Sequence, residues 1–114
     1  EKFFKKRICM IFEPHRFSRT QQLFEDFVKV LSQIDQLLLL DIYPASESPI
    51  RGISSKKLVA AINQNNGNAI YVSNISAQKW LEENFNDYDV LLTQGAGTIS
   101  QLNHSIKKKW ALKK

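Results

Sequence analysis

The sequence alternates four times between a short apolar run and a longer segment with helical periodicity, and this alternation leaves few folds open. The apolar runs have the length of strands and cover residues 7–12, 37–43, 69–72 and 89–93. The helical segments carry apolar residues on one face and cover residues 19–34, about 54–65, 76 onward and about 98–110. Because crossovers between parallel strands are right-handed, this order predicts one α/β domain spanning residues 1–114. We expect a Rossmann-like, three-layer, doubly wound and mostly parallel sheet of about four strands, with helices on both faces.

The strand order expected along the sheet is 3-2-1-4, which places the fourth strand beside the first. Residues Leu37 to Leu40 are apolar at every position, as is typical of a central parallel strand buried on both faces. Asn66 and Gly67 are expected to end the second helix. The expected helix N-caps are serines, namely Ser18 in a capping box with Gln21, Ser54 or Ser55, and Ser76.

The charge distribution argues against a nucleic-acid partner. The formal net charge is +5, but four of the sixteen Lys and Arg residues lie within residues 1–7 and five within residues 107–114. Residues 8–106 carry seven basic and ten acidic residues, so the body of the domain has no basic stripe. A basic-tailed nucleic-acid binder would require salt-sensitive binding that is lost with both tails.

Compartment and membrane contact can also be predicted. No apolar run reaches the roughly 18–20 residues of a membrane helix, and residues 1–6 are not followed by the apolar core of a signal peptide. The single cysteine, Cys9, lies inside an apolar run, where we expect it to fill the core rather than act as a nucleophile. One unpaired cysteine is typical of a reducing compartment, so a cytoplasmic protein without a membrane partner is expected.

Three polar loops follow strands at the edge where doubly wound sheets bind ligands. These loops cover residues 13–19, 43–50 and 94–98. In the first loop, Arg16 and Arg19 stand at the start of a helix, where the helix dipole disfavours cations. Free helix N–H groups and the two guanidinium groups would form a site for a carboxylate or phosphate, with His15 as a further donor or proton relay. The alternative is that both arginines are solvated and His15 is an ordinary loop histidine.

The residues Gly95, Gly97 and Thr98 resemble part of a glycine fingerprint for dinucleotides, but Ser100 stands where the third glycine is expected. Only 14 residues follow Ser100, too few for a further strand with a ribose-binding acid, so a close strand-to-helix turn is favoured. The sequence has no G-x-x-x-x-G-K-[ST] phosphate loop and no Cys/His cluster with metal-ligand spacing. Asp41 ends an apolar strand, so it is expected to be a buried partner of an arginine or a metal-water ligand, and a structural role is favoured.

Four segments match a known pattern. Residues 12–20 read F-E-P-H-R-F-S-R-T, residues 38–47 end in D-I-Y-P-A-S-E, residues 49–52 read P-I-R-G, and residues 91–99 read L-L-T-Q-G-A-G-T-I. They resemble F-Q-P-H-R-Y-[ST]-R-T, [DE]-V-Y-P-A-G-E, P-I-P-G and L-[VI]-L-[TV]-Q-G-A-G-N-I of the Mur ligase family, in particular of the ligases that join L-alanine to UDP-N-acetylmuramate. The resemblance covers residues 7–105 in the same order and spacing.

The resemblance implies that the chain is the C-terminal domain of a three-domain ligase, truncated at its N-terminal end, because the family's D-D-Y-x-H-H-P segment is absent. In the family an N-terminal domain holds UDP-N-acetylmuramate and a central domain carries the ATP and Mg²⁺ sites. ATP then phosphorylates the sugar carboxylate, and the amine of L-alanine attacks the acyl phosphate. The last domain orients substrates, so this chain alone is expected to be inactive and to hold neither cofactor nor metal.

The resemblance also implies site residues. His15, Arg16 and Arg19 would receive L-alanine and the acyl phosphate. The supporting loop residues would be Ser18, Glu47, Gly95, Gly97 and Thr98. The sequence departs from the family pattern at Glu13, Ser46 and Thr98, and the serine puts a positive-φ turn in question.

Two further expectations follow from this resemblance. A helix missing before the first strand would leave one sheet face partly bare, with an apolar patch. The partners would be UDP-N-acetylmuramate, L-alanine and ATP, with no nucleic acid. The alternative is a freestanding, non-catalytic nucleotide- or anion-binding α/β module, and a G-T-x-G-K-T ATPase domain upstream in the gene would discriminate between the two.

Overall fold

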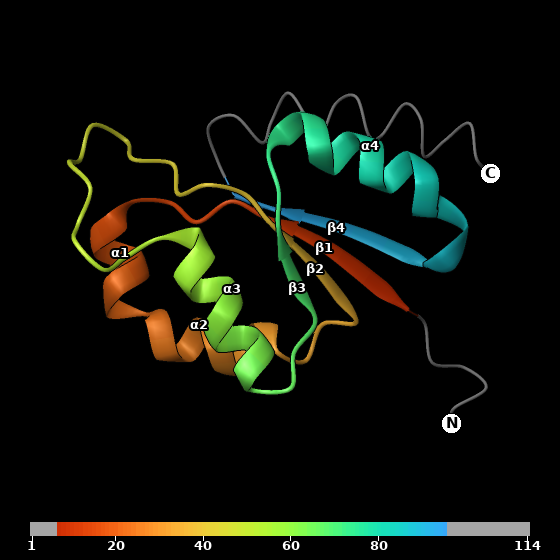
Figure 1. Cartoon of the computed structure of the whole chain (residues 1–114), viewed down its shortest axis with the longest axis horizontal. Coiled ribbons are helices and arrows are strands. Elements are labelled where there is room, and N and C mark those ends of the chain that lie inside the picture. Colours follow the sequence, from red (N-terminus) through yellow and green to blue (C-terminus); the bar gives the residue numbers. More distant parts are fainter. Residues whose placement is uncertain (1–6, 96–114) are drawn as a thin grey trace.

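A computed structural model describes residues 7–95 of the chain, and its centre is a four-stranded sheet (Figure 1). The strands are β1 (Ile8–Phe12), β2 (Gln36–Leu39), β3 (Ala69–Tyr71) and β4 (Val90–Gln94). All neighbouring strands are parallel and the order is β3-β2-β1-β4, which confirms the predicted topology. The helix expected at about 98–110 lies outside the described residues.

Helices cover both faces of the sheet, which confirms the Rossmann-like α/β prediction. The helices are α1 (Phe17–Gln22), α2 (Phe24–Leu31), α3 (Ser55–Gln64) and α4 (Asn74–Asn84), and a 3-10 turn (Phe85–Asp87) follows α4. Figure 1 shows α1, α2 and α3 on one side of the sheet and α4 on the other. This is the arrangement that right-handed crossovers produce when the chain returns from β3 across the sheet to β4.

The apolar run of β2 forms the middle of both cores. Leu38 and Leu40 pack in the cluster that contains Ala77 and Leu81 of α4. Leu37 and Leu39 pack in the opposite cluster, together with residues of α2, α3, β1 and β3. Side chains alternate between the faces of a strand, so a strand covered by helices on both sides must be apolar throughout. The side chains of Leu37, Leu38 and Leu39 are fully buried.

The helix expected over residues 19–34 is in fact two helices, which corrects that prediction. α1 begins earlier, at Phe17, and ends at Gln22, while α2 ends at Leu31. Leu23 separates them with φ −103° and ψ 13°, outside the helical region. The hydrogen-bonding pattern nevertheless continues through the break, because Leu23 N–H donates to Arg19 (3.0 Å) and Leu23 accepts from Phe27 (2.8 Å). The periodicity is preserved while the axis bends, which explains why the sequence pattern looked like one helix.

The ends of the later elements agree only in part with prediction. Ser54 caps α3 by accepting from Lys57 N–H at 3.2 Å, as predicted. Asn66, with φ 64°, closes that helix, and Gly67 N–H donates to Ile62. The cap of α4 was misplaced, because Ser73 Oγ accepts from Ser76 N–H rather than Ser76 acting as the cap. The second strand ends at Leu39 instead of Tyr43, because the chain then leaves the sheet for the loop that carries Tyr43.

One side chain of β4 is unusually exposed for a strand residue. Leu92 pairs in register with Met10, so its side chain lies on the α1–α3 face of the sheet. Leu92 is 40% exposed, which is high for a leucine in a sheet.

Cys9, on the opposite face of the sheet, is buried, and burial raises the pKa of its thiol to about 12. This agrees with the predicted role of Cys9 in the core. Within residues 7–95, no helix has the length and apolarity that crossing a membrane requires.

Candidate functional site

The loops that follow β1, β2 and β4 meet at one edge of the sheet. Glu13 N–H donates to the Gln94 carbonyl at 2.9 Å, which joins the first loop to the end of β4. Tyr43 N–H donates to Pro14 (2.8 Å) and Arg16 N–H donates to Tyr43 (2.7 Å), which joins the first loop to the second. The predicted adjacency of the three loops is thus confirmed as far as Gly95. Gly97 and Thr98 lie outside the described residues.

Gly95 makes the junction between β4 and the first loop unusually close. Its φ is +138°, which L side chains rarely adopt. A Cβ placed on Gly95 would lie 2.7 Å from the Glu13 carbonyl oxygen and 2.9 Å from Glu13 Cβ. The glycine therefore permits a close backbone approach between the end of β4 and the first loop.

A cavity of about 320 Å³ lies at this junction, and we name it the switch-point cavity. Its lining comprises Phe12, Glu13, His15, Arg19, Leu23, Phe27, Gln94 and Gly95. Three of these residues, Phe12, Leu23 and Phe27, give it an apolar wall, and the Phe12 and Phe27 rings meet edge to face at 5.3 Å. Leu23, the residue at the bend between α1 and α2, is one of the lining residues. The cavity thus combines cationic, anionic and apolar groups in a small space.

The two arginines that the sequence places together share one depression, but they do not share the switch-point cavity. Both line a shallow depression with His15, Ser18 and Gln22, but only Arg19 also lines the switch-point cavity. Arg16 is the N-cap of α1 rather than a residue of its first turn, and its φ of 74° is strained for a residue with a side chain. Such a conformation costs on the order of 1–3 kcal/mol and is characteristic of functional sites. The side chain of Arg16 is exposed.

His15 is positioned by the second loop. Its ring stacks on Tyr43 with centroids 5.6 Å apart and an angle of 17° between the planes. The two residues also form an isolated parallel β-bridge. Both the backbone bridge and the ring stacking therefore fix the position of His15. The stacked ring of His15 is one of the groups that line the switch-point cavity.

Glu47 occupies the start of α1, which corrects the expectation of free helix N–H groups. One carboxylate oxygen accepts from the N–H groups of Phe17 (2.7 Å) and Ser18 (3.1 Å), and the other accepts from the Ser18 hydroxyl. The predicted capping box of Ser18 with Gln21 is wrong for the same reason, since Ser18 lies inside the helix and bonds to a residue 29 positions away. An internal carboxylate already satisfies these donors, so a ligand anion must rely on the arginine side chains.

The turn that presents Glu47 retains a positive φ although serine replaces the family's glycine. Ala45 has φ 50° and Ser46 has φ 74°. Glu47 N–H then donates back to the Pro44 carbonyl at 2.9 Å. The departure at Ser46 therefore leaves the turn itself intact.

The Glu47 cap should make the first loop sensitive to acid. Hydrogen bonds from Ser18 and Phe17, with a smaller contribution from the charge of Arg16, lower the pKa of Glu47. A lowered pKa means that the stabilisation is fully present above the unfolded value of about 4.3 and is lost as pH falls through the folded value. We expect Glu47→Gln to be less stable than wild type at pH 7, with the difference shrinking towards pH 3.

Urea unfolding at both pH values measures this difference. Glu25→Gln, at an exposed glutamate of α2, is the matched control. A stability difference between Glu47→Gln and wild type that stays constant from pH 7 to pH 3 would contradict the capping role.

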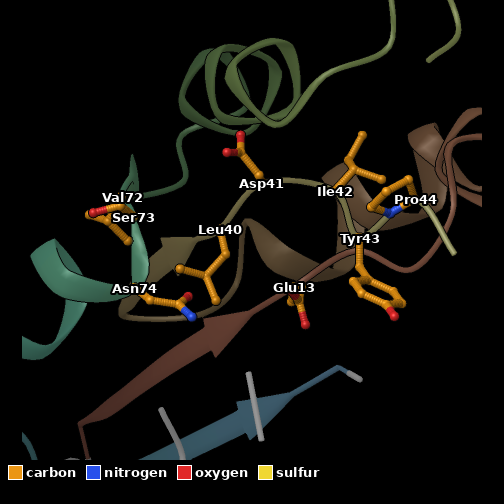
Figure 2. Close-up of a pocket in the computed structure, with 9 residues that line it drawn as sticks. All are labelled: Glu13, Leu40, Asp41, Ile42, Tyr43, Pro44, Val72, Ser73 and Asn74. Carbon is orange, nitrogen blue, oxygen red and sulfur yellow. The ribbon is translucent and has the colours of Figure 1, made fainter. Parts of the chain in front are cut away.

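A second cavity, which the sequence analysis missed, lies between the ends of β2 and β3 (Figure 2). This β2–β3 cavity measures about 280 Å³ and is lined by Glu13, Leu40, Asp41, Ile42, Tyr43, Pro44, Val72, Ser73 and Asn74. Asp41 was expected to be buried, but it is exposed and accepts a hydrogen bond from the Tyr71 hydroxyl. The signal available in the sequence was a carboxylate two residues beyond an apolar strand, at the ligand-binding edge.

No family model matches the chain. Among residues 7–95, no three His, Cys, Asp or Glu side chains lie close enough together to hold a metal ion.

Proposed function

We propose that the chain is the C-terminal domain of a cytoplasmic Mur-type amide ligase and that it receives the incoming amino acid, L-alanine. In this proposal, UDP-N-acetylmuramate, ATP and Mg²⁺ are bound mainly by other domains of a longer protein. Among residues 7–95, no group of His, Cys, Asp and Glu side chains fits a metal ion, and the roles proposed below use none.

The observation that carries the proposal is the composition of the switch-point cavity. The Arg19 guanidinium can bind a carboxylate through two N–H groups, and His15 lines the same cavity. The Glu13 carboxylate can accept from an ammonium group, and Leu23 and Phe27 offer an apolar surface. An aliphatic α-amino acid offers a matching group for each of these: its α-carbon carries a carboxylate, an ammonium group and an apolar side chain.

The chemistry required of such a domain is orientation rather than bond making. The amine must lose a proton before it attacks an acyl phosphate, and the carbon that it attacks must lie close to it. Arg19 and His15 would fix the amino acid by its carboxylate, and the exposed side chain of Arg16 would face the negative charge that develops on the phosphate. The carboxylate of Glu47 holds the loop that carries all three residues.

The 114-residue chain alone should therefore release no ADP when it is mixed with ATP, UDP-N-acetylmuramate and L-alanine. The product of the complete gene should release ADP only when all three substrates are present. A coupled ADP assay with each substrate omitted in turn tests both statements. Activity of the isolated chain would overturn the domain assignment, and ADP release that is independent of L-alanine would overturn the amino-acid assignment.

A further inference from the structure

Asn66 and Gly67 form the only Asn–Gly pair in the sequence, and they lie in the turn between α3 and β3. An asparagine before a glycine is prone to deamidation, because glycine has no side chain to shield its amide nitrogen. Asn66 is exposed, and among residues 7–95 its side-chain amide makes no hydrogen bond. The neighbouring side-chain amides all donate hydrogen bonds, namely those of Asn63, Asn65 and Asn68.

Deamidation of this pair needs only water and the groups of the turn itself. The Gly67 nitrogen loses its proton to hydroxide and attacks Cγ of Asn66, so an N–Cγ bond forms. The Cγ–Nδ2 bond breaks, and ammonia leaves with a proton taken from water. Water then opens the resulting succinimide at one of its two carbonyls. Opening at the side-chain carbonyl gives aspartate, and opening at the main-chain carbonyl gives isoaspartate, with no change of oxidation state.

The folded turn withholds the nitrogen that must attack. Gly67 N–H donates to the Ile62 carbonyl at 2.9 Å, so its proton is held within the end of α3. A Cβ placed on Gly67 would lie 2.8 Å from the same carbonyl oxygen and 3.0 Å from Ser32 Cα. Because α2 and α3 enclose Gly67 so tightly, its nitrogen cannot turn towards Asn66 unless the end of α3 opens.

An isoaspartate at position 66 does not fit the native turn. It lengthens the main chain by one carbon atom directly before Gly67, which has no free space around it. The left-handed conformation that closes α3, with φ 64° at Asn66, would be lost with the normal backbone. An aspartate keeps the chain length but places a negative charge at the C-terminal end of α3, where the helix dipole disfavours it.

We propose that Asn66–Gly67 is a deamidation site that the fold keeps closed. The succinimide forms only while the end of α3 is open, and the isoaspartyl product cannot restore the native turn. A chain that has reacted therefore keeps a covalent record of that opening. This site is independent of the proposed amino-acid site, because the turn precedes β3 whereas the switch-point cavity lies beyond the carboxyl ends of the strands.

Incubation of the chain in mildly alkaline buffer, with and without urea, tests the proposal. Ammonia release and peptide mass spectrometry measure the deamidation rate at Asn66, which should be at least roughly tenfold lower in the folded chain. Hydrogen exchange of the Gly67 amide should be slowed by a similar factor, because both reactions require the same opening. Equal deamidation rates in the folded and unfolded chain, or reaction in urea mainly at another asparagine, would overturn the proposal.

Two variants distinguish opening of this turn from general destabilisation. Asn65→Ala removes the hydrogen bond from its side-chain amide to the Ser32 hydroxyl (3.2 Å), which ties the end of α3 to α2. Deamidation of the folded Asn65→Ala chain should therefore be severalfold faster, while its rate in urea matches wild type. Asn84→Ala removes a comparable bond to the Trp80 carbonyl at the end of α4, and this matched control should deamidate like wild type.

Two outcomes would contradict this mechanism. If the folded Asn65→Ala and Asn84→Ala chains deamidated at the same rate, opening at the end of α3 would not control the reaction. If the isoaspartyl chain isolated from urea refolded with wild-type stability, the product would fit the native turn. We expect instead that the isoaspartyl chain unfolds at a lower urea concentration than wild type.

Discussion

Replacing Gly95 by alanine should lower the free energy of unfolding by about 2–4 kcal/mol, because strain and a steric clash add together. The strain comes from a φ of +138°, and the clash comes from a Cβ that would lie 2.7 Å from the Glu13 carbonyl oxygen. The atoms in the way belong to the backbone and Cβ of Glu13, so no side-chain rotation can relieve the contact. Urea unfolding followed by circular dichroism measures the effect.

Gly52→Ala is the matched control for this substitution. Gly52 also has a positive φ, +84°, but a Cβ placed on it meets no atom within 4 Å. It should therefore show the strain alone, about 1 kcal/mol. If the two variants lost equal stability, the close approach of Gly95 to Glu13 would not be a determinant of the fold.

Removing the Arg19 guanidinium should reduce kcat/KM for L-alanine by roughly ten- to hundredfold in the ligase that we propose contains this chain. A charge-assisted hydrogen bond in a closed site contributes about 1.5–3 kcal/mol, which corresponds to that range. Arg19→Ala should change kcat/KM for UDP-N-acetylmuramate much less, since in the proposed ligase another domain would bind the sugar nucleotide. Steady-state kinetics with each substrate varied separately would show the difference.

Two further substitutions sharpen the test of Arg19. Arg19→Lys should rescue activity only in part, because lysine lacks the planar fork of donors. Lys29→Ala, at an exposed cation of α2, should leave the kinetics unchanged. An unaltered kcat/KM for L-alanine in a folded Arg19→Ala enzyme would remove Arg19 from the site and leave it as a surface residue worth about 0.5 kcal/mol or less.

The parts of the fold that could be predicted are those set by local pattern and chain handedness. The apolar run from Leu37 to Leu40 predicted a strand covered on both faces, and the doubly wound pattern with right-handed crossovers predicted the strand order that is observed. The close approach of Gly95 to Glu13 agrees with the predicted close turn, while the helix expected after it lies outside the described residues. The bend at Leu23 could not be predicted, because the apolar residues on its two sides keep one helical period across it.

The features of the site that sequence reasoning missed depend on contacts between distant residues. Glu47 caps a helix that begins 30 positions earlier, so nothing near Phe17 or Ser18 in the sequence indicates that their N–H groups are already bonded. The same applies to Asp41, whose partner is a tyrosine 30 positions later. The charge pattern therefore predicted more free N–H donors at the anion site than the structure has, and it gave no indication of the second cavity.

Glu13 forms part of the wall of both cavities, and its side chain is only 3% exposed. A ligand that draws this carboxylate towards one cavity must change the surface offered to the other. Any such coupling is reciprocal, so a ligand in one cavity would alter the affinity of the other cavity by the same factor in both directions. One buried side chain beyond the end of β1 thereby links two cavities whose linings share no other residue.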